Sequence, residues 1–233
     1  MTTKSIHWLQ QTPLFQGLDS LALDDISRHA HEKNYKKGEQ IFAIGDKAEG
    51  FFVLMEGWTK LYRISREGGE MIIHIFGPGE SFAEAAVFNE RPIYPANAEA
   101  LSDVCLLEIP GNYFIQKIGQ SPSFALKILG SIAALQHYLV QQLEQVTSRT
   151  APQRIGTFLL KFCQKTPGAH TGDMIVNLPY DKSIISARLN IKPETFSRAL
   201  AKLAPYGVTT DGTAIVITNP QALSEFCDIQ LGD

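Results

Sequence analysis

The chain has 233 residues and a mass of 25.8 kDa, which allows one large domain or two modest ones joined by a connector. Its 44% hydrophobic and 19% charged residues are typical of a globular protein and exclude a disordered or fibrous chain. The net charge of -3 is unevenly distributed, because residues 1–149 carry -4 whereas residues 150–220 carry eight basic and four acidic side chains, net +4. The asymmetry points to a polyanion partner for the C-terminal part, with uneven surface charge as the alternative.

The sequence predicts a cytoplasmic location and no membrane partner. The first eight residues lack a long apolar core and a small-residue cleavage site, and no apolar run reaches the roughly 20 residues of a membrane span. Cys105, Cys163 and Cys227 stand far apart, as expected for reduced thiols. Close Cys/His pairs are absent, so no zinc cluster is expected.

Residues 1–33 predict a helical segment that packs on the domain after it. A Pro-Leu-Phe sequence at 13–15 is followed by Asp19 and Ser20, which form a helix start signal. The apolar positions of this helix are Leu21, Leu23, Ile26 and Ala30.

Residues 34–110 predict an all-β sandwich, jelly roll or barrel. Short apolar clusters recur at intervals of about ten residues, and glycines between them supply the positive φ that tight turns require. The predicted strands are 40–43, 51–55, 59–64, 71–76 and 104–109.

Residues 111–147 become helical, and from Ser121 onwards they predict one long amphipathic helix. Its apolar residues recur three or four positions apart in a narrow seam flanked by glutamines. The seam residues are Ile128, Ile132, Leu135, Leu139, Leu143 and Val146. Near-heptad spacing favours pairing with a second copy of the chain; a helix lying on its own domain is the alternative.

Residues 150–220 predict a small domain that contains two short helices around a tight turn. A helix opens near Ala151, a short strand covers 174–179, and a hairpin over 208–217 turns at Asp211-Gly212. Between strand and hairpin, one helix runs over 183–189, Asn190 suits the turn, and Pro193 suits the first turn of the second helix. This arrangement is the helix-turn-helix motif.

The second helix of this motif has an apolar and a polar face. The residues expected to be buried are Phe196, Leu200 and Leu203, and those expected to be exposed are Glu194, Ser197, Arg198 and Lys202. Arg198 can bond a guanine through O6 and N7, Glu194 can accept from a cytosine amino group, and Ser197 lets the helix approach a base edge. The candidates for phosphate contacts are Lys182, Ser183, Lys192, Thr195 and Lys202. The alternative is a solvent-exposed helix face with a Glu194–Arg198 ion pair, and the spacing alone does not distinguish this alternative from DNA reading.

Nearly the whole chain resembles the Crp/Fnr superfamily of bacterial transcription regulators. The matching sensor segments, in order, are 13–15, 35–39, 41–42, 45–46, 52–54, 57, 60–63 and 79–82. The helix at 194–198 carries the superfamily's E..SR pattern, which belongs to the Fnr-like branch, whose operators resemble TTGAT and its inverted repeat.

The resemblance implies an α+β fold in three parts. These are a cyclic-nucleotide-binding-like β-roll (jelly roll) sensor at 1–120, a dimerisation helix at 121–149 and a winged helix-turn-helix DNA-binding domain at 150–233. It implies a homodimer that binds palindromic double-stranded DNA under the control of a small effector in the β-roll; the alternative is a regulator of the same fold that responds to a cyclic nucleotide or needs no effector. RNA polymerase would be a further partner of an activator. A sensor module that has lost DNA binding is disfavoured by the intact second helix and hairpin.

The candidate effector-pocket residues are Phe82, Glu84, Arg91, Tyr94, His74 and His137. In the catabolite-activator branch, a Gly-Glu pair and an Arg-Ser/Thr-Ala turn hold the phosphate of a cyclic nucleotide. Here Glu84 is kept, but Ala83 replaces the glycine, Tyr94 stands where the arginine belongs, and Pro95 lacks an N–H. Arg91 lies three residues early and would need a shifted loop. Cyclic-nucleotide binding is therefore not expected.

Two other cofactors of related regulators are an iron–sulfur cluster and haem. An iron–sulfur cluster needs several N-terminal cysteines, and the first cysteine here is Cys105. The segments 82–85 and 193–198 resemble the Dnr-type branch, which responds to nitric oxide with haem as the proposed sensor. A haem needs an axial ligand, usually histidine. The candidates are His7, His29, His31, His74 and His137, of which His137 is favoured and His29 and His31 are read as solvated helix-end residues.

No enzyme activity is expected. The alternative, a cupin-like metal enzyme, would bring several histidines and a carboxylate together on its β-roll, whereas the predicted strands hold only His74. Cys163 has no base nearby in the sequence and is interpreted as a core or surface thiol.

Overall fold

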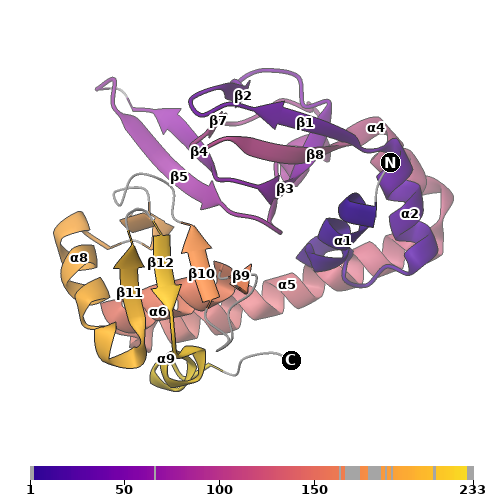
Figure 1. Cartoon of the computed structure of the whole chain (residues 1–233). Coiled ribbons are helices and arrows are strands. Elements are labelled where there is room, and N and C mark those ends of the chain that lie inside the picture. Colours follow the sequence, from indigo (N-terminus) through magenta and orange to yellow (C-terminus); the bar gives the residue numbers. More distant parts are fainter. Residues whose placement is uncertain are drawn as a thin grey trace. The chain divides into compact units, whose positions relative to one another are not determined.

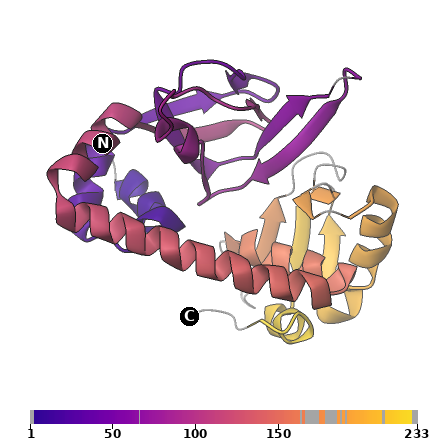
Figure 2. The same ribbon diagram turned by 180° about the vertical axis from the view of Figure 1, so that it is seen from behind.

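The computed structural model describes residues 3–65, 67–162, 164–165, 174–177, 185–186, 188–189, 191–211 and 214–229. The chain divides into two compact units, Met1–Gln141 and Gln142–Asp233, and helix α5 (Pro122–Ser148) runs across the division (Figures 1 and 2). None of the described helices is long and apolar enough to cross a membrane.

The first unit contains a β-roll made of two four-stranded antiparallel sheets (Figure 1). One sheet has the strand order β1-β8-β3-β6 and the other β2-β7-β4-β5. The strands are β1 (His31–Tyr35), β2 (Gln40–Phe42), β3 (Gly50–Glu56), β4 (Thr59–Ile64), β5 (Glu70–Phe76), β6 (Ser81–Phe82), β7 (Asn97–Ala100) and β8 (Val104–Pro110). All five strands predicted from the sequence are present.

Three strands have no apolar cluster that could predict them. Strand β1 is an edge strand with mostly exposed polar side chains, so His31 starts a strand and does not end a helix. Strand β7 buries alanines, whose small side chains give a weak apolar signal. Strand β6 is two residues long.

The helices of the first unit are α1 (Thr3–Gln11), the 3-10 helix η1 (Pro13–Phe15), α2 (Ser20–His29), α3 (Glu84–Val87) and α4 (Gly111–Gln120). The Asp19 carboxylate accepts the Ala22 N–H at 2.9 Å and caps α2, which confirms the predicted start signal. Of the predicted apolar positions, Leu21 is the exception, because its side chain is 81% exposed. Helix α1 was not predicted, since its sequence is largely polar.

Aromatic side chains join the helices to the β1-β8-β3-β6 sheet. The ring of Phe114 on α4 lies 5.0 Å from that of Phe51 on β3, and Phe15 in η1 lies 6.1 Å from Phe114. Phe124, near the start of α5, lies 5.6 Å from Phe114. All four rings belong to one buried core, which therefore includes the first turn of α5.

Helix α5 packs against this core in its first half. Ile128 is 3% exposed and belongs to the core, and the Ser131 hydroxyl accepts the Gly17 N–H at 3.3 Å. The predicted seam is therefore wrong at Ile128, which packs on its own unit.

Helix α5 also exposes three large apolar side chains, of which Ile132 belongs to the predicted seam and the other two do not. Leu126, Leu129 and Ile132 are 70%, 60% and 43% exposed, and we call these three residues the outer stripe. Leu135 is half-buried. The side chains of Leu139, Leu143 and Val146 lie outside the described part of the chain.

The second unit combines a small antiparallel sheet of order β11-β12-β10-β9 with helices packed on it (Figure 1). Its elements are α6 (Ala151–Phe162), β9 (Gln164–Lys165), β10 (Met174–Asn177), α8 (Pro193–Ala201), the 3-10 helix η2 (Ala204–Tyr206), β11 (Val208–Asp211), β12 (Ala214–Ile217) and α9 (Pro220–Phe226). Its core includes Ile155, Leu159, Phe196, Ile215 and Leu223, all fully buried. Helix α9 was not predicted from the sequence.

Candidate nucleic-acid interface and sensor interior

Helix α8 separates into a buried and an exposed face, as the sequence predicts. The buried residues are Phe196, Ala199, Leu200 and Leu203. The exposed residues are Glu194, Ser197, Arg198 and Lys202. Because positions three and four apart share one side of a helix, Glu194, Ser197 and Arg198 form one polar surface, which we call the reading surface.

The start of α8 suits an anionic partner. Lys192 is exposed, takes an extended conformation as the N-cap and makes no side-chain capping bond. Pro193 occupies the first turn, where a missing N–H costs nothing. The N-terminal end of a helix carries partial positive charge and unbonded N–H groups, which favour a phosphate. Thr195, another predicted phosphate contact, is half-buried.

The helix before α8 is described in part. Leu189 donates its N–H to the carbonyl of Ile185 at 2.9 Å, and Ile191 donates to Ser186 at 2.8 Å, so a tight turn precedes α8. Ile185 and Ser186 are buried, which fits a helix packed on the core. The predicted residues Lys182, Ser183, Asn190 and Cys163 lie outside the described residues.

The predicted hairpin follows α8 in the chain and is formed by β11 and β12. Val208 pairs with Ile217, and Asp211 pairs with Ala214, so residues 212–213 connect the strands and lie outside the described part. Thr209 and Thr210 are exposed on β11. A helix pair followed by a hairpin of this kind is the winged helix-turn-helix arrangement.

The interior of the β-roll is filled by stacked aromatic rings. Tyr94 is 4% exposed, its ring lies 3.8 Å from that of Phe42, and its hydroxyl donates to the carbonyl of Gly50 at 2.7 Å. Phe82 is buried and stacks on Phe52 and Phe76 at 5.2 and 5.0 Å. Burial raises the pKa of Tyr94 to about 12, so its phenol stays protonated at neutral pH. Of the candidate pocket residues, Phe82 and Tyr94 are thus brought into one core.

Glu84 begins α3 beside this aromatic core. Burial raises the pKa of its carboxyl group, and a hydrogen bond from Ser81 acts in the opposite direction. The preceding Ala83 has φ 72, in the left-handed region that favours glycine. The backbone therefore keeps a glycine-like turn although the side chain has changed.

The remaining pocket candidates lie at the surface. Arg91, His74 and His137 are exposed, and the His74 ring meets the edge of the Phe76 ring at 4.6 Å. His29 ends α2, where its ring stacks on that of Tyr113 at 4.0 Å. The structure thus does not gather Arg91, His74 and His137 around the buried pair of Phe82 and Tyr94.

These residues do not fit a haem as they are arranged. A haem needs a wide apolar slot with an axial ligand directed into it. The space inside the β-roll is taken by Phe42, Phe82 and Tyr94, and the candidate ligands His74 and His137 are exposed. Among the described residues, no group of three or more His, Cys, Asp or Glu could hold a metal ion.

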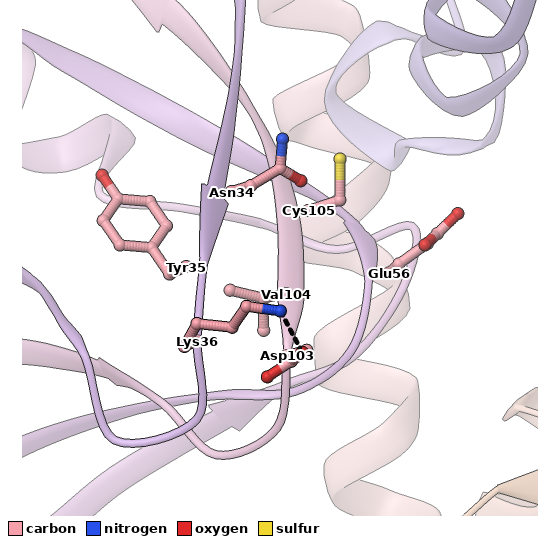
Figure 3. A pocket seen from close by; sticks show the side chains of 7 residues that line it. All are labelled: Asn34, Tyr35, Lys36, Glu56, Asp103, Val104 and Cys105. Carbon is pink, nitrogen blue, oxygen red and sulfur yellow. Dashed lines mark hydrogen bonds and ion pairs between the residues drawn. The ribbon is translucent and has the colours of Figure 1, made fainter.

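A small cavity of about 170 Å³ lies at another place on the β-roll, between β1, β3 and β8 (Figure 3). It is lined by Asn34, Tyr35, Lys36, Glu56, Asp103, Val104 and Cys105. Cys105 pairs with Asn34 on one side and Glu56 on the other, and the Lys36 ammonium forms an ion pair with Asp103 at 2.7 Å. The cavity is smaller than the roughly 300 Å³ at which drug-sized ligand sites begin, and none of the predicted effector residues lines it.

Both units match known protein families. Residues 32–121 match the cyclic nucleotide-binding domain, and residues 153–226 match the Crp-like helix-turn-helix domain. The second match contains α6, α8 and the β11–β12 hairpin, and therefore the whole reading surface.

Proteins similar over almost the whole chain come from several bacteria. A crystal structure from Ruegeria pomeroyi DSS-3 has a TM-score of 0.84 and 32% sequence identity and covers 97% of this chain and 98% of that one. The nitrogen fixation regulation protein FixK of Rhizobium meliloti is 29% identical over 196 residues, which are 83% of this chain and 86% of FixK. The crystal structure of DNR from Pseudomonas aeruginosa has a TM-score of 0.58 and 28% identity and covers 97% of this chain and all of that one.

Proposed function

Because this chain belongs to the Crp/Fnr family of DNA-binding transcription regulators, which are not enzymes, we propose that it binds an Fnr-like palindromic operator as a homodimer. The operator would consist of two TTGAT-type half-sites in inverted repeat. A small effector at the β-roll would shift the population between dimer geometries that match and do not match this operator.

The reading surface is the observation that carries the proposal. Phe196 on α8 and Leu203 just after it are fully buried in the core and hold the helix in place. Glu194, Ser197 and Arg198 are exposed on the other side of the helix. Arginine recognises guanine by a planar pair of bonds, and a carboxylate accepts from the amino group of cytosine. Glu194 is the second residue of α8, and because its carboxylate would be repelled by phosphates, its exposed position beside Ser197 and Arg198 favours a base contact.

Exposed cations beside the reading surface support phosphate contacts. Lys192 precedes α8 and Lys202 follows it, so one lysine flanks each end of the helix. We propose that both bind phosphates, with Thr195, Lys182 and Ser183 as further contacts. Such contacts position the helix on the duplex without specifying a sequence.

The outer stripe of α5 supports the homodimer. Three large apolar side chains, Leu126, Leu129 and Ile132, are exposed next to the small residues Gly130 and Ala133. Contiguous apolar surface of this kind is typical of a protein interface. A second copy of α5 would cover it, and the two-fold symmetry of that pair would match the palindrome.

The aromatic core makes a cyclic nucleotide a poor effector for this β-roll. Tyr94 stands where the resemblance places a phosphate-binding arginine, and its hydroxyl is already bonded to Gly50. We therefore propose an effector other than a cyclic nucleotide. Calorimetric titration with cyclic AMP and cyclic GMP should give no binding heat, and a micromolar binding isotherm would contradict this part of the proposal.

A nitric-oxide response through haem is the second candidate, on the resemblance to the Dnr-type branch. The described side chains form no slot for a haem, because Phe42, Phe82 and Tyr94 fill the interior of the β-roll. Titration of the purified protein with haemin tests it, because a saturable Soret shift that is lost in His137→Ala would show a bound haem with that ligand.

The operator test uses the full chain and fluorescent duplexes. The protein should bind a palindrome of two TTGAT half-sites more tightly than a single half-site, and replacing the guanine in both halves should weaken binding by about 1–3 kcal/mol per half-site. Equal affinity for the palindrome and for an unrelated duplex at the same salt concentration would refute the proposal.

A further inference from the structure

The small cavity beside β1, β3 and β8 is built on one row of paired residues (Figure 3). Cys105 on β8 pairs with Asn34 on β1 and with Glu56 at the end of β3, and all three line the cavity. Because neighbouring strands lie about 4.8 Å apart, the Cα atoms of Asn34 and Glu56 are separated by about 10 Å, with Cys105 between them. The row therefore sets the width of the cavity.

The floor of this cavity is apolar and its rim is polar and charged. The floor residues Val104 and Cys105 are 4% and 6% exposed. The exposed residues of the rim are Asn34, Lys36, Glu56 and Asp103. The rim therefore offers both signs of charge around a small apolar surface.

One side of the rim is held by two turns that are bonded to each other. The Asp103 carboxylate accepts the Lys36 ammonium at 2.7 Å and the Lys37 N–H at 3.1 Å. The Gly38 N–H donates to the carbonyl of Ala100, the last residue of β7, at 2.7 Å. The turn after β1 is thus fastened to the turn before β8, and a ligand would not have to order these groups.

The side of the rim that carries Glu56 is held by the turn after β3. Gly57 has φ 85, and a Cβ at this position would lie 2.2 Å from the Asp103 carbonyl oxygen. Trp58 donates its N–H to the Ser102 hydroxyl at 3.0 Å. This turn therefore packs closely against the turn before β8, so Glu56 and Asp103 keep their places on one rim.

The size and the hydrogen-bonding groups of the cavity define the ligand that it can take. Its volume of about 170 Å³ equals that of about five waters, which gives room for about five to eight non-hydrogen atoms. An ammonium group has three N–H donors, so Lys36 can bond Asp103 and a ligand carboxylate at the same time. The Asn34 amide can donate to that carboxylate, and Glu56 can accept from a ligand ammonium group.

We propose that this cavity binds a small zwitterionic amino acid of the size of alanine. Its carboxylate lies at Lys36 and Asn34, its ammonium group lies at Glu56, and its side chain packs on the apolar floor. A plain carboxylic acid fits less well, because the rim holds one lysine and two carboxylates, net -1. A plain amine would leave Lys36 and Asn34 without the carboxylate that they can bind. The inference goes beyond the proposed function and does not depend on DNA binding.

The experiment follows backbone amide signals of the isotope-labelled full-length protein by NMR during titration with L-alanine, in the absence of DNA. The signals of residues 34, 36 and 105 report on the site. Ethylamine lacks the carboxylate of alanine and propionate lacks its ammonium group, so these two compounds serve as matched ligands.

Three variants test the placement of the ligand. Glu56→Gln removes one charge and nearly keeps the shape of the side chain, and Asn34→Phe fills the cavity from an exposed position. Glu49→Gln is the matched control, because Glu49 is an exposed carboxylate of the same unit that pairs with Lys47 and does not line the cavity.

Alanine should shift these signals saturably, with a dissociation constant of about 0.1–10 mM, the range open to a ligand of about six non-hydrogen atoms. Ethylamine and propionate should each bind about fivefold more weakly or worse, and so should alanine with Glu56→Gln, because a charge-assisted hydrogen bond is lost. Asn34→Phe should abolish the saturable shifts, and Glu49→Gln should behave as wild type.

The opposite results would overturn the inference. Shifts that rise linearly to tens of millimolar alanine would show that wild type has no such site. Equal affinity for alanine and for either matched ligand would show that the zwitterion is not recognised. If Glu56→Gln does not fold, Asn34→Phe decides, because unchanged alanine binding in that variant would place the ligand elsewhere. None of these results bears on the operator test, which is made without an amino acid.

Discussion

Tyr94 and Phe42 lie with their rings 3.8 Å apart and 15° from parallel inside the β-roll, and the Tyr94 hydroxyl donates to the Gly50 carbonyl at 2.7 Å. The pair joins the segment after α3 to β2, and the hydrogen bond joins it to β3. One side chain thus holds three parts of the sensor together, in the place where the resemblance puts a ligand-binding arginine.

Tyr94→Phe should lower the free energy of unfolding by about 1–2 kcal/mol, because a buried carbonyl loses its donor while the ring remains. Urea denaturation followed by circular dichroism measures this change. Tyr206→Phe is the control, since the described contact of Tyr206 is stacking on Phe226 at 4.1 Å, which the substitution keeps. An unchanged midpoint for Tyr94→Phe would show that the hydroxyl adds no net stability.

The raised pKa of Tyr94 predicts a loss of stability in alkali. In the unfolded chain the phenol ionises near pH 10, whereas in the folded protein its pKa is about 12. The unfolded state therefore binds fewer protons between these values, and stability should fall from pH 10 to 12 by on the order of 1–3 kcal/mol. Comparing urea midpoints at pH 9 and 11 for wild type and Tyr94→Phe isolates this contribution, which should be absent from the variant.

Arg198→Ala should weaken binding to the palindrome by about 1–3 kcal/mol per half-site and abolish discrimination at the guanine position. Lys202→Ala should instead weaken binding to all sequences alike and reduce the salt dependence by about one counterion per half-site. Anisotropy titrations over a range of salt concentrations distinguish the two. Retained guanine preference in Arg198→Ala would mean that another residue reads this base.

Ile132→Glu should shift the protein from dimer to monomer, because it places a charge in the apolar outer stripe. Light scattering after gel filtration measures the mass. Leu21→Glu is the matched control, because Leu21 is 81% exposed on α2 and does not belong to the outer stripe, so its replacement should leave the mass unchanged. A dimer in Ile132→Glu would place the interface elsewhere.

Gly57→Ala should destabilise the sensor more than Gly68→Ala. Both glycines have positive φ, so alanine costs about 1–2 kcal/mol of backbone strain at either position. At Gly57 the new Cβ would also lie 2.2 Å from the Asp103 carbonyl oxygen, whereas at Gly68 no heavy atom lies within 4 Å. Equal midpoints for the two variants in thermal unfolding would show that the turn at Gly57 relaxes freely.

The parts of the fold with a strong apolar period could be predicted from the sequence, and the parts held by single polar bonds could not. The strands around Phe52 and Leu106 and the two faces of α8 follow directly from the pattern of apolar residues. The hydrogen bond from Arg149 to the Asp228 carbonyl, just after α9, joins residues about 80 positions apart in the chain, and no local signal points to it.

The helix α5 illustrates a more specific limit. Its apolar residues occur on more than one side, so spacing alone could not tell the face that packs on the sensor from the face left outside. The spacing assigns Ile128 to the seam although it is buried, and it omits Leu126 and Leu129 although they are exposed. The polar Ser131, bonded to Gly17, marks the inner face, and this signal appears only when both segments are seen together.

Helix α5 therefore has little freedom to change its sequence. Between residues 124 and 137, Ile128 and Ser131 fit the sensor, where a Cβ on Gly17 would lie 3.0 Å from the Ser131 hydroxyl, and the outer stripe is available to a second chain. A saturation mutagenesis survey of residues 124–137 should then show two kinds of intolerant position, those that face the sensor and those of the outer stripe, with Ile132 one helical turn after the buried Ile128.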